Sequence, residues 1–534
     1  MNKIFEQLLH YYNLSEEEFI KRQNTNGLGD IPNPFVFMDN FSEKIEYLKS
    51  AIINKKKIVI YGDYDVDGIT STSIILLTLK KLNIDAGYFI PSRYVEGYGI
   101  TQNRIDQFID KKYDLIITVD NGVNASDEIS YARDNGIDVF VIDHHEILGD
   151  IPNANYIVHQ SYCHYVDYNI SAAFLSLLVS YGLLGYYDDY LLSLAGIAVL
   201  SDMMPMVNAN LALVNIAINR IRKNKYLQYK LLEDRNNNDI DKISYIDISF
   251  DIIAPLNGIG RYKKGLETNK VVSYLVSSSS EEITSLFKFI SENDDKKKNR
   301  LKELRGLVDY QNDINSPVYI DIIHNIEEGL IGGVINSLLS SLKKPVLLLT
   351  ESSKDPNVLV GSFRSTKEYN LIDSLAHVSK YLISSGGHQN ACGLTIKKEN
   401  YEELRKGLND YFSNFSVNKD NEKYLVINEN DINFETIKII DSFGPFGTQF
   451  EYPHLAVFVS KKDIVNSCKN DSHLISFINN NSRYVFFSYD KSFDLLPNEQ
   501  MIYFVGTLKE SIYKNQHNCD FIVSKFVEKK DVDY

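Results

Sequence analysis

The stretch Lys57-Ile-Val-Ile-Tyr-Gly-Asp-Tyr-Asp-Val-Asp-Gly68 carries three carboxylates at alternate positions directly after an apolar run. Side chains at alternate positions of an extended backbone point to the same face, so Asp63, Asp65 and Asp67 should lie close together. Like charges this close raise one another's pKa unless a cation neutralises them. The stretch therefore predicts a buried strand that ends in a divalent metal site.

Two further apolar runs also end in polar side chains. Asp120 follows Leu115-Ile-Ile-Thr-Val119, and Asp143-His144-His145 follows Ile137-Asp-Val-Phe-Val-Ile142. Imidazole and carboxylate groups together are ligands for a transition metal or for a pair of Mg²⁺ or Mn²⁺ ions. The three strand ends favour one metal centre that is built from separate segments.

The acidic stretch has two other interpretations. It matches the first half of a calcium EF-hand loop, but the twelfth position would be Ile74 rather than Glu, and a strand rather than a helix precedes it. A turn rich in Asp, without a metal, stays open for this stretch alone because Asp favours turns and helix caps.

The length of 534 residues predicts about three to five domains. The net charge of −15, from 56 basic and 71 acidic residues, argues against tight nonspecific binding of duplex nucleic acid. It does not exclude a basic groove on an acidic body.

The four cysteines are scattered and form no CxxC pair, which predicts a reducing cytoplasmic location and no thiolate metal site. No apolar run approaches the roughly 20 residues of a membrane helix, so we expect no membrane partner.

Apolar runs alternate with helical segments in the first third of the chain. The strands are expected at 57–61, 86–90, 114–119, 137–142 and 155–158. This alternation is typical of a parallel, doubly wound sheet, in which ligands bind at the carboxyl ends of the strands. Residues 170–235 are expected to be helical.

A long charged helix should begin at the capping-box sequence Ser279-Ser-Glu-Glu282 and run to about 313. It contains a cluster of basic residues: Lys296, Lys297, Lys298, Arg300, Lys302 and Arg305. This helix is interpreted as a solvated connector, with a basic wall facing a nucleic-acid strand as the alternative.

The remaining segments predict a second α/β unit and a β-rich end. The α/β unit should have strands at 317–323, 345–350 and 358–363, a helix at 331–342 and a glycine-rich turn at Gly386-Gly387. Short β-like runs between 455 and 530 fit a small β-barrel.

The predicted domain organisation of this α/β protein has five parts. They are an N-terminal helical segment (1–50), a parallel-sheet domain with the expected metal site (51–235), a long helical connector (236–315), a smaller α/β domain (316–420), and a linker with a small β-barrel (421–534).

Asp143-His144-His145 resembles the motif that names the DHH phosphoesterases, and Leu194-Ala-Gly-Ile-Ala-Val-Leu-Ser-Asp202-Met-Met-Pro resembles the fourth motif of that family. Within it, the chain is most similar to the RecJ family of single-strand-specific 5′→3′ DNA exonucleases. The similar segments are Ile90-Pro-Ser-Arg93-Tyr-Val-Glu-Gly-Tyr98-Gly, Ala254-Pro-Leu-Asn257-Gly-Ile-Gly-Arg261, Glu328-Gly-Leu-Ile-Gly332, Gly361-Ser-Phe-Arg364-Ser365, Gly386-Gly387-His388 and Gly444-Pro-Phe-Gly447. They cover roughly 55 to 530 in order and imply a DHH domain, a DHHA1 domain and an OB-fold.

The resemblance implies roles for individual residues. Two Mn²⁺ or Mg²⁺ ions would be held by Asp65, Asp67, Asp120, His144 and Asp202, with Asp63 as a further ligand. Asp120 would bridge the ions, His145 would face the scissile phosphate beside His144, and Asp143 would orient an imidazole. The DNA strand would be gripped by Tyr98, Arg261, Ser362, Arg364, Gly387 and His388.

The implied activity is metal-dependent hydrolysis of single-stranded DNA to 5′-mononucleotides in DNA repair and recombination, with a helicase or single-strand-binding protein as partner. Two alternatives stay open. One is a DHH hydrolase of short substrates: a nanoRNase, a nucleoside bisphosphate phosphatase or a cyclic dinucleotide phosphodiesterase. The other is a scaffold without catalysis, which the retained carboxylates disfavour.

The chain departs from the family pattern at three places. Tyr61 stands where other DHH branches have His, so one metal is expected to depend on Asp63 or water. His159-Gln160 replaces the usual Asn-Pro, and Ile170-Ser-Ala-Ala173 replaces a Ser/Cys-Gly-Ala sequence.

Overall fold

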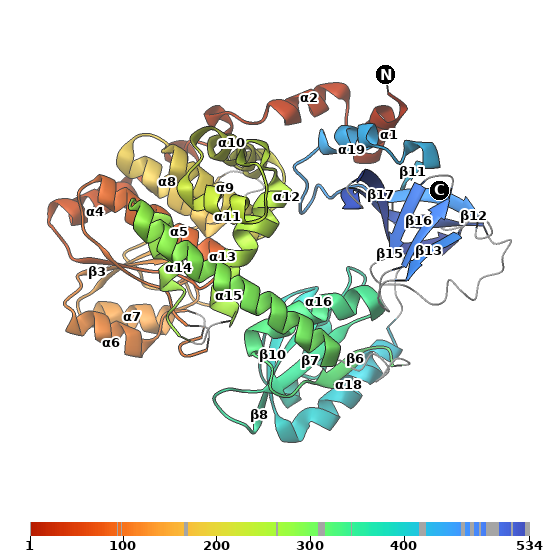
Figure 1. Cartoon of the computed structure of the whole chain (residues 1–534). Coiled ribbons are helices and arrows are strands. Elements are labelled where there is room, and N and C mark those ends of the chain that lie inside the picture. The colour runs from red at the N-terminus through yellow and green to blue at the C-terminus, as the bar shows by residue number, and fades with distance from the viewer. Residues whose placement is uncertain are drawn as a thin grey trace. The chain divides into compact units, whose positions relative to one another are not determined.

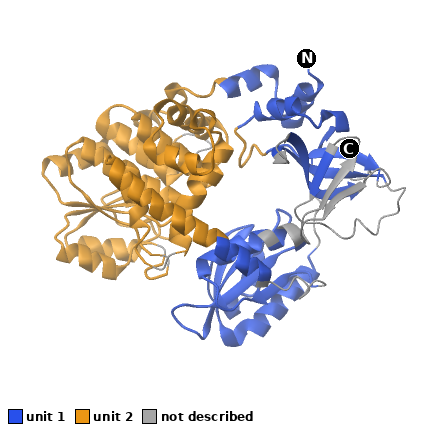
Figure 2. Cartoon of the chain, viewed as in Figure 1, with its two compact units in different colours: residues 1–23, 299–444, 452–534 blue, residues 24–298, 445–451 orange. Residues whose placement is uncertain are grey.

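The computed structural model describes residues 2–92, 94–97, 99–164, 169–262, 265–307, 316–342, 344–415, 423–460, 465–469, 475–479, 482–486, 501–513 and 516–528. Two compact units divide the chain (Figure 2). The first comprises residues 1–23, 299–444 and 452–534, and the second comprises residues 24–298 and 445–451. The five domain bounds given above stay predictions.

The second unit contains a parallel five-stranded sheet with the order β2-β1-β3-β4-β5. Its strand β3 is labelled in Figure 1. Its strands are β1 (Ile58–Tyr61), β2 (Gly87–Phe89), β3 (Leu115–Val119), β4 (Asp138–Ile142) and β5 (Tyr156–Val158). All five predicted strands are confirmed, and the sheet is parallel as predicted.

Helices cover both faces of this sheet. On one face, α6 (Gln102–Asp110) and α7 (Ser126–Asp134) bury Ile105, Phe108 and Ile129 against alternate residues of β1, β3 and β4. On the other, α4 (Phe41–Ile53), α5 (Val66–Lys81) and α8 (Ala172–Leu184) pack on the opposite set of side chains. Burial on both faces explains why the central strands β1, β3 and β4 are mostly apolar.

The predicted helical region 170–235 is confirmed. After α8 it contains α9 (Asp189–Ser201), α10 (Asn208–Asn224) and α11 (Leu227–Arg235). A short helix α12 (Tyr245–Asp247) and a π-helical segment (Ile248–Ile253) lead into α13 (Ala254–Tyr262) and α14 (Asn269–Val276).

The long connector helix α15 (Ser280–Leu307) forms, with 308–315 outside the described residues. Only half of its predicted capping box forms. Ser279 Oγ accepts a hydrogen bond from the Glu282 N–H (3.3 Å), but the Glu282 carboxylate accepts from the Ser277 hydroxyl (2.6 Å). The box is incomplete because the Ser277 hydroxyl takes both places in its second half: it donates to the Glu282 carboxylate and accepts from the Ser279 N–H.

The predicted basic cluster of α15 is partly neutralised by acidic neighbours. Lys297 and Lys298 lie 2.9 and 2.8 Å from Asp294, whose side chain is buried. Arg300 lies 3.2 Å from Glu327. These pairs favour the connector interpretation for the three cations.

The predicted N-terminal helices form as α1 (Lys3–Tyr12), α2 (Glu16–Asn24) and α3 (Pro34–Phe37), followed by α4. In the first unit, α1 and α2 pack beside α19 (Phe434–Asp441), where the rings of Phe5 and Phe19 lie 5.5 and 4.5 Å from that of Phe443. Residues more than 400 positions apart therefore share one small core.

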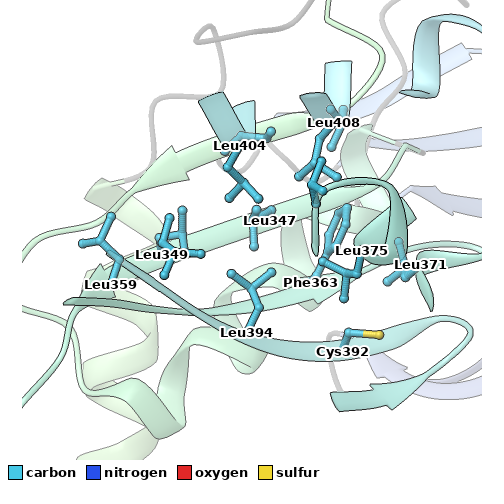
Figure 3. Close-up of a cluster of buried hydrophobic side chains, with 14 of the residues drawn as sticks. Leu347, Leu349, Leu359, Phe363, Leu371, Leu375, Cys392, Leu394, Leu404 and Leu408 are labelled. Atoms are coloured by element: carbon cyan, nitrogen blue, oxygen red, sulfur yellow. The ribbon is translucent and has the colours of Figure 1, made fainter. Parts of the chain in front are cut away.

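The first unit also contains a mixed five-stranded sheet with the order β6-β7-β8-β10-β9. Its strands are β6 (Tyr319–Ile322), β7 (Val346–Glu351), β8 (Val358–Arg364), β9 (Leu382–His388) and β10 (Ala391–Lys397). The helices beside it are α16 (Ile331–Leu342), α17 (Leu371–His377) and α18 (Tyr401–Ser413). Figure 3 shows the core that Leu347, Phe363, Leu394 and Leu404 form on one face.

The predicted turn at Gly386-Gly387 is wrong. Both glycines lie inside strand β9, and the hairpin turn to β10 comes later, at Gln389-Asn390. Gly387 has a φ of +135°, which L side chains rarely adopt, so the glycine signal reflects an unusual strand conformation rather than a turn.

The C-terminal part forms a seven-stranded sheet with the order β11-β12-β16-β17-β15-β14-β13. The strands are β11 (Leu425–Ile427), β12 (Leu455–Ser460), β13 (Val465–Lys469), β14 (Ile475–Asn479), β15 (Ser482–Phe486), β16 (Met501–Tyr513) and β17 (Gln516–Glu528). The β-rich prediction is confirmed. Within the described residues no pairing joins β11 to β13, so the sheet is OB-like but open.

Helices that are both long and apolar enough to cross a bilayer do not occur among the described residues.

Replacing Gly387 should destabilise the protein much more than replacing its neighbour Gly386. A Cβ at Gly387 would lie 2.3 Å from the Ala391 carbonyl oxygen, whereas one at Gly386 meets nothing within 4 Å. Gly387→Ala should lower the free energy of unfolding by at least about 1–3 kcal/mol, the cost of a strained backbone conformation. Urea denaturation of both variants measures this, and equal midpoints would contradict the strand geometry.

Candidate metal centre

The acidic loop after β1 is held by the start of two helices. Asp65 caps α5, and its Oδ1 accepts a hydrogen bond from the Gly68 N–H (3.1 Å). The Asp67 carboxylate accepts from the N–H groups of Ala172 and Ala173 at the start of α8, both at 2.8 Å. The positive end of α8 therefore fixes the orientation of a buried carboxylate.

Asp120 directly follows β3 in a strained conformation. Its φ is +61°, in the left-handed region that few non-glycine residues adopt, and its side chain is buried. Its N–H donates to the Ile142 carbonyl at the end of β4 (2.9 Å). The neighbouring strand thus holds Asp120 in a conformation that turns its carboxylate toward the loop after β1, and strain of this kind is concentrated at functional sites.

Asp143 orients the second histidine, a role that the resemblance implied for one of the imidazoles. Its Oδ1 lies 2.8 Å from His145 Nδ1, and its Oδ2 accepts from the Val123 N–H (2.9 Å). Asp143 is buried, whereas the His145 side chain is 38% exposed. The imidazole of His145 is therefore anchored on its inner side.

Carboxylates from three separate segments converge on His144. Its Nε2 lies 3.3 Å from Asp120 Oδ1, 3.5 Å from Asp202 Oδ2 and 3.6 Å from Asp67 Oδ2. Asp202 is the C-cap residue of α9. Residues that the sequence predicted at the ends of separate segments, namely at the start of α5, after β3, after β4 and after α9, are thus brought together.

The spacing of these atoms fits shared cations. Three groups each place all their ligand atoms within 4.8 Å of one another: Asp63, Asp65 and Asp120; Asp67, His144 and Asp202; and Asp120, His144 and His145. Ligands around an octahedral ion at 2.0–2.1 Å stand about 3 Å apart, close to the separations around His144. Asp120 and His144 each belong to two groups, and of the two only the carboxylate of Asp120 has two oxygens with which to bridge a pair of ions.

Burial raises the pKa of the clustered carboxyls. Burial, and after it the charges of neighbouring carboxylates, raise the pKa of Asp67 to about 7 and the pKa of Asp202 to about 8. The pKa of Asp120 is also raised well above its usual value, by burial and then by the charge of Asp67. Without cations the cluster is electrostatically unfavourable, so it should bind them readily.

The two adjacent histidines are pushed in opposite directions. Burial, followed by the charge of His145, lowers the pKa of His144 to about 4, so His144 is the neutral imidazole that a metal requires. Burial also acts to lower the pKa of His145, but the hydrogen bond and charge of Asp143 outweigh it and raise this pKa to about 9. His145 therefore carries a positive charge near neutral pH.

His159 and Gln160, for which the sequence predicted no role, hold the loop of His144 and His145. Gln160 Nε2 donates to the His144 carbonyl (2.8 Å), and its Oε1 accepts from the Ile170 N–H (3.0 Å). His159 Nδ1 accepts from the Ser161 N–H (3.0 Å), so Nε2 carries the proton that is donated to the His145 carbonyl (2.8 Å). The one sequence signal for this role is that His159 and Gln160 directly follow strand β5.

Tyr61, at the place of a family histidine, contributes no ligand to these groups. Its hydroxyl donates to the Gly99 carbonyl (2.8 Å), and its ring stacks with Phe89 at 5.9 Å. Asp63 lies in a ligand group with Asp65, consistent with the expectation that Asp63 takes over.

The predicted strand-gripping residues lie in both units. Arg261 is exposed near the end of α13 in the second unit, and its carbonyl accepts from the Tyr94 hydroxyl (2.6 Å). Tyr98 lies outside the described residues.

The other strand-gripping residues belong to the sheet of the first unit. Ala391 pairs with Arg364 on one side and with His388 on the other, and Gly393 likewise pairs with Ser362 and Gly386. Cross-strand neighbours share a face, so Ser362, Arg364 and His388 border a floor of small residues. Gly387 pairs with Cys392 instead and contributes backbone only.

The chain matches two family models, the DHH family N-terminal domain over residues 57–196 and the DHHA1 domain over residues 315–414. It is 31% identical over 466 residues to the single-stranded-DNA-specific exonuclease RecJ of Bacillus subtilis, covering 85% of this chain and 58% of that protein. It is 26% identical over 447 residues to RecJ of Haemophilus influenzae, covering 77% and 76%.

Solved structures show the same fold. A RecJ structure from Thermus thermophilus in complex with Mn²⁺ superposes with a TM-score of 0.77 at 20% identity, covering 92% of this chain and 72% of that one. The exonuclease RecJ bound to manganese gives a TM-score of 0.62 at 23% identity, covering 73% and 97%. This chain spans less than three fifths of the length of the Bacillus subtilis relative.

The stability of the metal-free protein should fall as the pH rises from 5 to about 8. Asp67 and Asp202 bind protons more tightly in the folded protein than in the unfolded chain, whose carboxyl pKa is near 3.8, so ionisation favours unfolding over this range. Added Mn²⁺ should therefore raise the Tm more at pH 8.5 than at pH 6. Thermal melts with and without Mn²⁺ measure both effects.

Asp202→Asn is the control, because it removes one of the carboxyl groups that titrate in this range. Its metal-free Tm should depend less on pH than that of the unmodified protein. Identical pH slopes for the two proteins would contradict the assignment.

Proposed function

We propose that the chain is a metal-dependent exonuclease of single-stranded DNA. It belongs to the DHH family and is a RecJ-like member with DHH and DHHA1 domains. It works from the 5′ end and releases 5′-mononucleotides in DNA repair and recombination. The observation that carries the proposal is the convergence of Asp67, Asp120 and Asp202 on His144.

The residues fit two divalent cations, Mn²⁺ or Mg²⁺. One would be held by Asp63, Asp65 and Asp120, and the other by Asp67, His144 and Asp202, with Asp120 between them. When bound, such ions lower the pKa of water and neutralise charge on a phosphodiester. The relatives described as Mn²⁺-bound RecJ support this choice of ion.

His145 acts directly on the substrate. Its ring is anchored by Asp143 through Nδ1 and, before cations bind, carries a positive charge at neutral pH. Its Nε2–H donates a hydrogen bond to a non-bridging phosphate oxygen, which stabilises the negative charge that grows there during hydrolysis.

The small-residue floor of the DHHA1 sheet binds the strand. Gly386, Gly393 and Ala391 let a sugar or base lie close to the backbone. The Nη1 of Arg364 donates to the carbonyls of Phe363 and Cys392, which keeps the guanidinium at the border of the floor, where it would bind a phosphate. His388 and Ser362 add hydrogen bonds at its border. Tyr98 and Arg261 contact the 5′ end of the strand.

The protein acts in the cytoplasm, where a helicase or a single-strand-binding protein supplies the strand. Free Cys163, Cys392 and Cys519 suit that reducing compartment.

Digestion of 5′-labelled and 3′-labelled DNA tests the activity. With Mn²⁺, single strands should lose a 5′ label at once as mononucleotide, whereas blunt duplexes and reactions with EDTA should give no product. A strong preference for dinucleotides over long strands would instead identify a hydrolase of short substrates.

Asp120→Ala should abolish release of mononucleotides, because it removes a carboxylate from two ligand groups. Asp110→Ala, which removes an exposed carboxylate of α6, should keep full activity. Undiminished release by Asp120→Ala would refute the assigned centre.

Arg364→Ala should raise the KM for single-stranded DNA with little change in kcat. Loss of a charge-assisted hydrogen bond costs about 1.5–3 kcal/mol, which corresponds to roughly 10- to 150-fold weaker binding. Arg364→Lys should recover only part of this, because a lysine cannot bind a phosphate through two parallel bonds.

The matched control is Lys397→Ala, which removes an exposed cation at the far end of β10. Steady-state kinetics should show an unchanged KM for it. An Arg364→Ala variant with the KM of the unmodified protein would exclude this floor as the binding surface.

A further inference from the structure

Helix α13 supplies a hydrogen bond to the acidic loop of the metal centre. Asn257 Oδ1 accepts from the Val66 N–H at 2.8 Å. Val66 is the first residue of α5 and stands between Asp65 and Asp67. The first N–H groups of a helix have no partner inside it, so Asn257 satisfies a donor that would otherwise lack one within α5.

The same side chain also reaches the segment that carries Asp202. Asn257 Nδ2 donates to Ser201 Oγ at 3.2 Å, and Ser201 is the last residue of α9, directly before Asp202. One amide therefore joins two segments whose carboxylates belong to the same ligand group, although the segments are far apart in sequence.

A second residue of α13 confirms that this helix lies directly on the loop. Gly260, one turn after Asn257, faces the Tyr64 carbonyl oxygen so closely that an added Cβ would stand 2.4 Å from it. Residues three apart share a helix face, so Asn257 and Gly260 together form the contact surface.

On another face, α13 is held by the connector helix. Lys297 of α15 donates from Nζ to the Ala254 carbonyl (3.0 Å) and would meet a Cβ at Gly258 at 2.6 Å. Lys297 is itself fixed by Asp294 at 2.9 Å. Helix α13, which carries Asn257, therefore contacts the acidic loop on one face and α15 on another, and these contacts fix its position.

We propose that Asn257 is a positioning residue that holds the acidic loop and the end of α9 at the spacing that two cations require. This inference rests on the proposed function. The clustered carboxylates repel one another when no cation is bound, and Asn257 opposes their separation by bonding to both segments. An amide suits this place because it accepts and donates at once without adding charge.

Calorimetric titration of the full chain with MnCl₂ tests the inference. The unmodified protein should bind two ions, and Asn257→Leu should bind them about 10- to 100-fold more weakly, the usual cost of losing a residue that orients metal ligands. Ser201→Ala removes one of the two bonds and should weaken binding less. Asn135→Leu, which removes an asparagine that bonds on the surface of α7, should change nothing.

Two further measurements separate positioning from a general loss of stability. Hydrogen exchange at the Val66 amide should quicken in metal-free Asn257→Leu, while amides of β10, which belongs to the other compact unit, keep their rates. Combining Asn257→Leu with Ser201→Ala should weaken Mn²⁺ binding no more than Asn257→Leu alone, because both changes break the same bond.

Equal Mn²⁺ affinities for Asn257→Leu, Ser201→Ala and the unmodified protein would overturn the inference and leave the proposed function intact. Failure of the unmodified protein to bind Mn²⁺ would instead overturn the proposed function.

Discussion

Repulsion among buried carboxylates at the carboxyl edge of one parallel sheet is the constraint on which the rest of this structure depends. Asp67, Asp120 and Asp202 lie within 3.6 Å of a single imidazole nitrogen, in surroundings that raise the pKa of all three. Such a cluster is stable only when other groups hold it or cations neutralise it. The amides at the start of α8 and the side chain of Asn257 provide part of that support.

The same environment gives adjacent histidines different chemistry. His144 is buried among the carboxylates and stays neutral, whereas His145 is partly exposed and is kept protonated by Asp143. The backbone of both is fixed by His159 and Gln160. One histidine is thereby suited to a cation and the other to a phosphate. The two residues differ in burial because they are consecutive in the loop after β4, so that their side chains point in different directions.

The sequence allowed good prediction where the signal is local and periodic. The five parallel strands, helix 331–342 and the polar strand ends follow from apolar runs and their last residues. Side-chain bonds between distant segments leave no such pattern, so the roles of His159, Gln160 and Asn257 were not predictable. Gly386-Gly387 was mistaken for a turn because glycine marks any unusual backbone conformation, including a strand with a positive φ.

Anomalous diffraction from crystals soaked in MnCl₂ tests the central claim most directly. The account predicts two manganese peaks about 3.5–4 Å apart, the separation of two-metal hydrolytic centres, with Asp120 touching both and His144 touching one. A structure with ordered Asp120 and His144 side chains but no manganese peak within reach of them would contradict it.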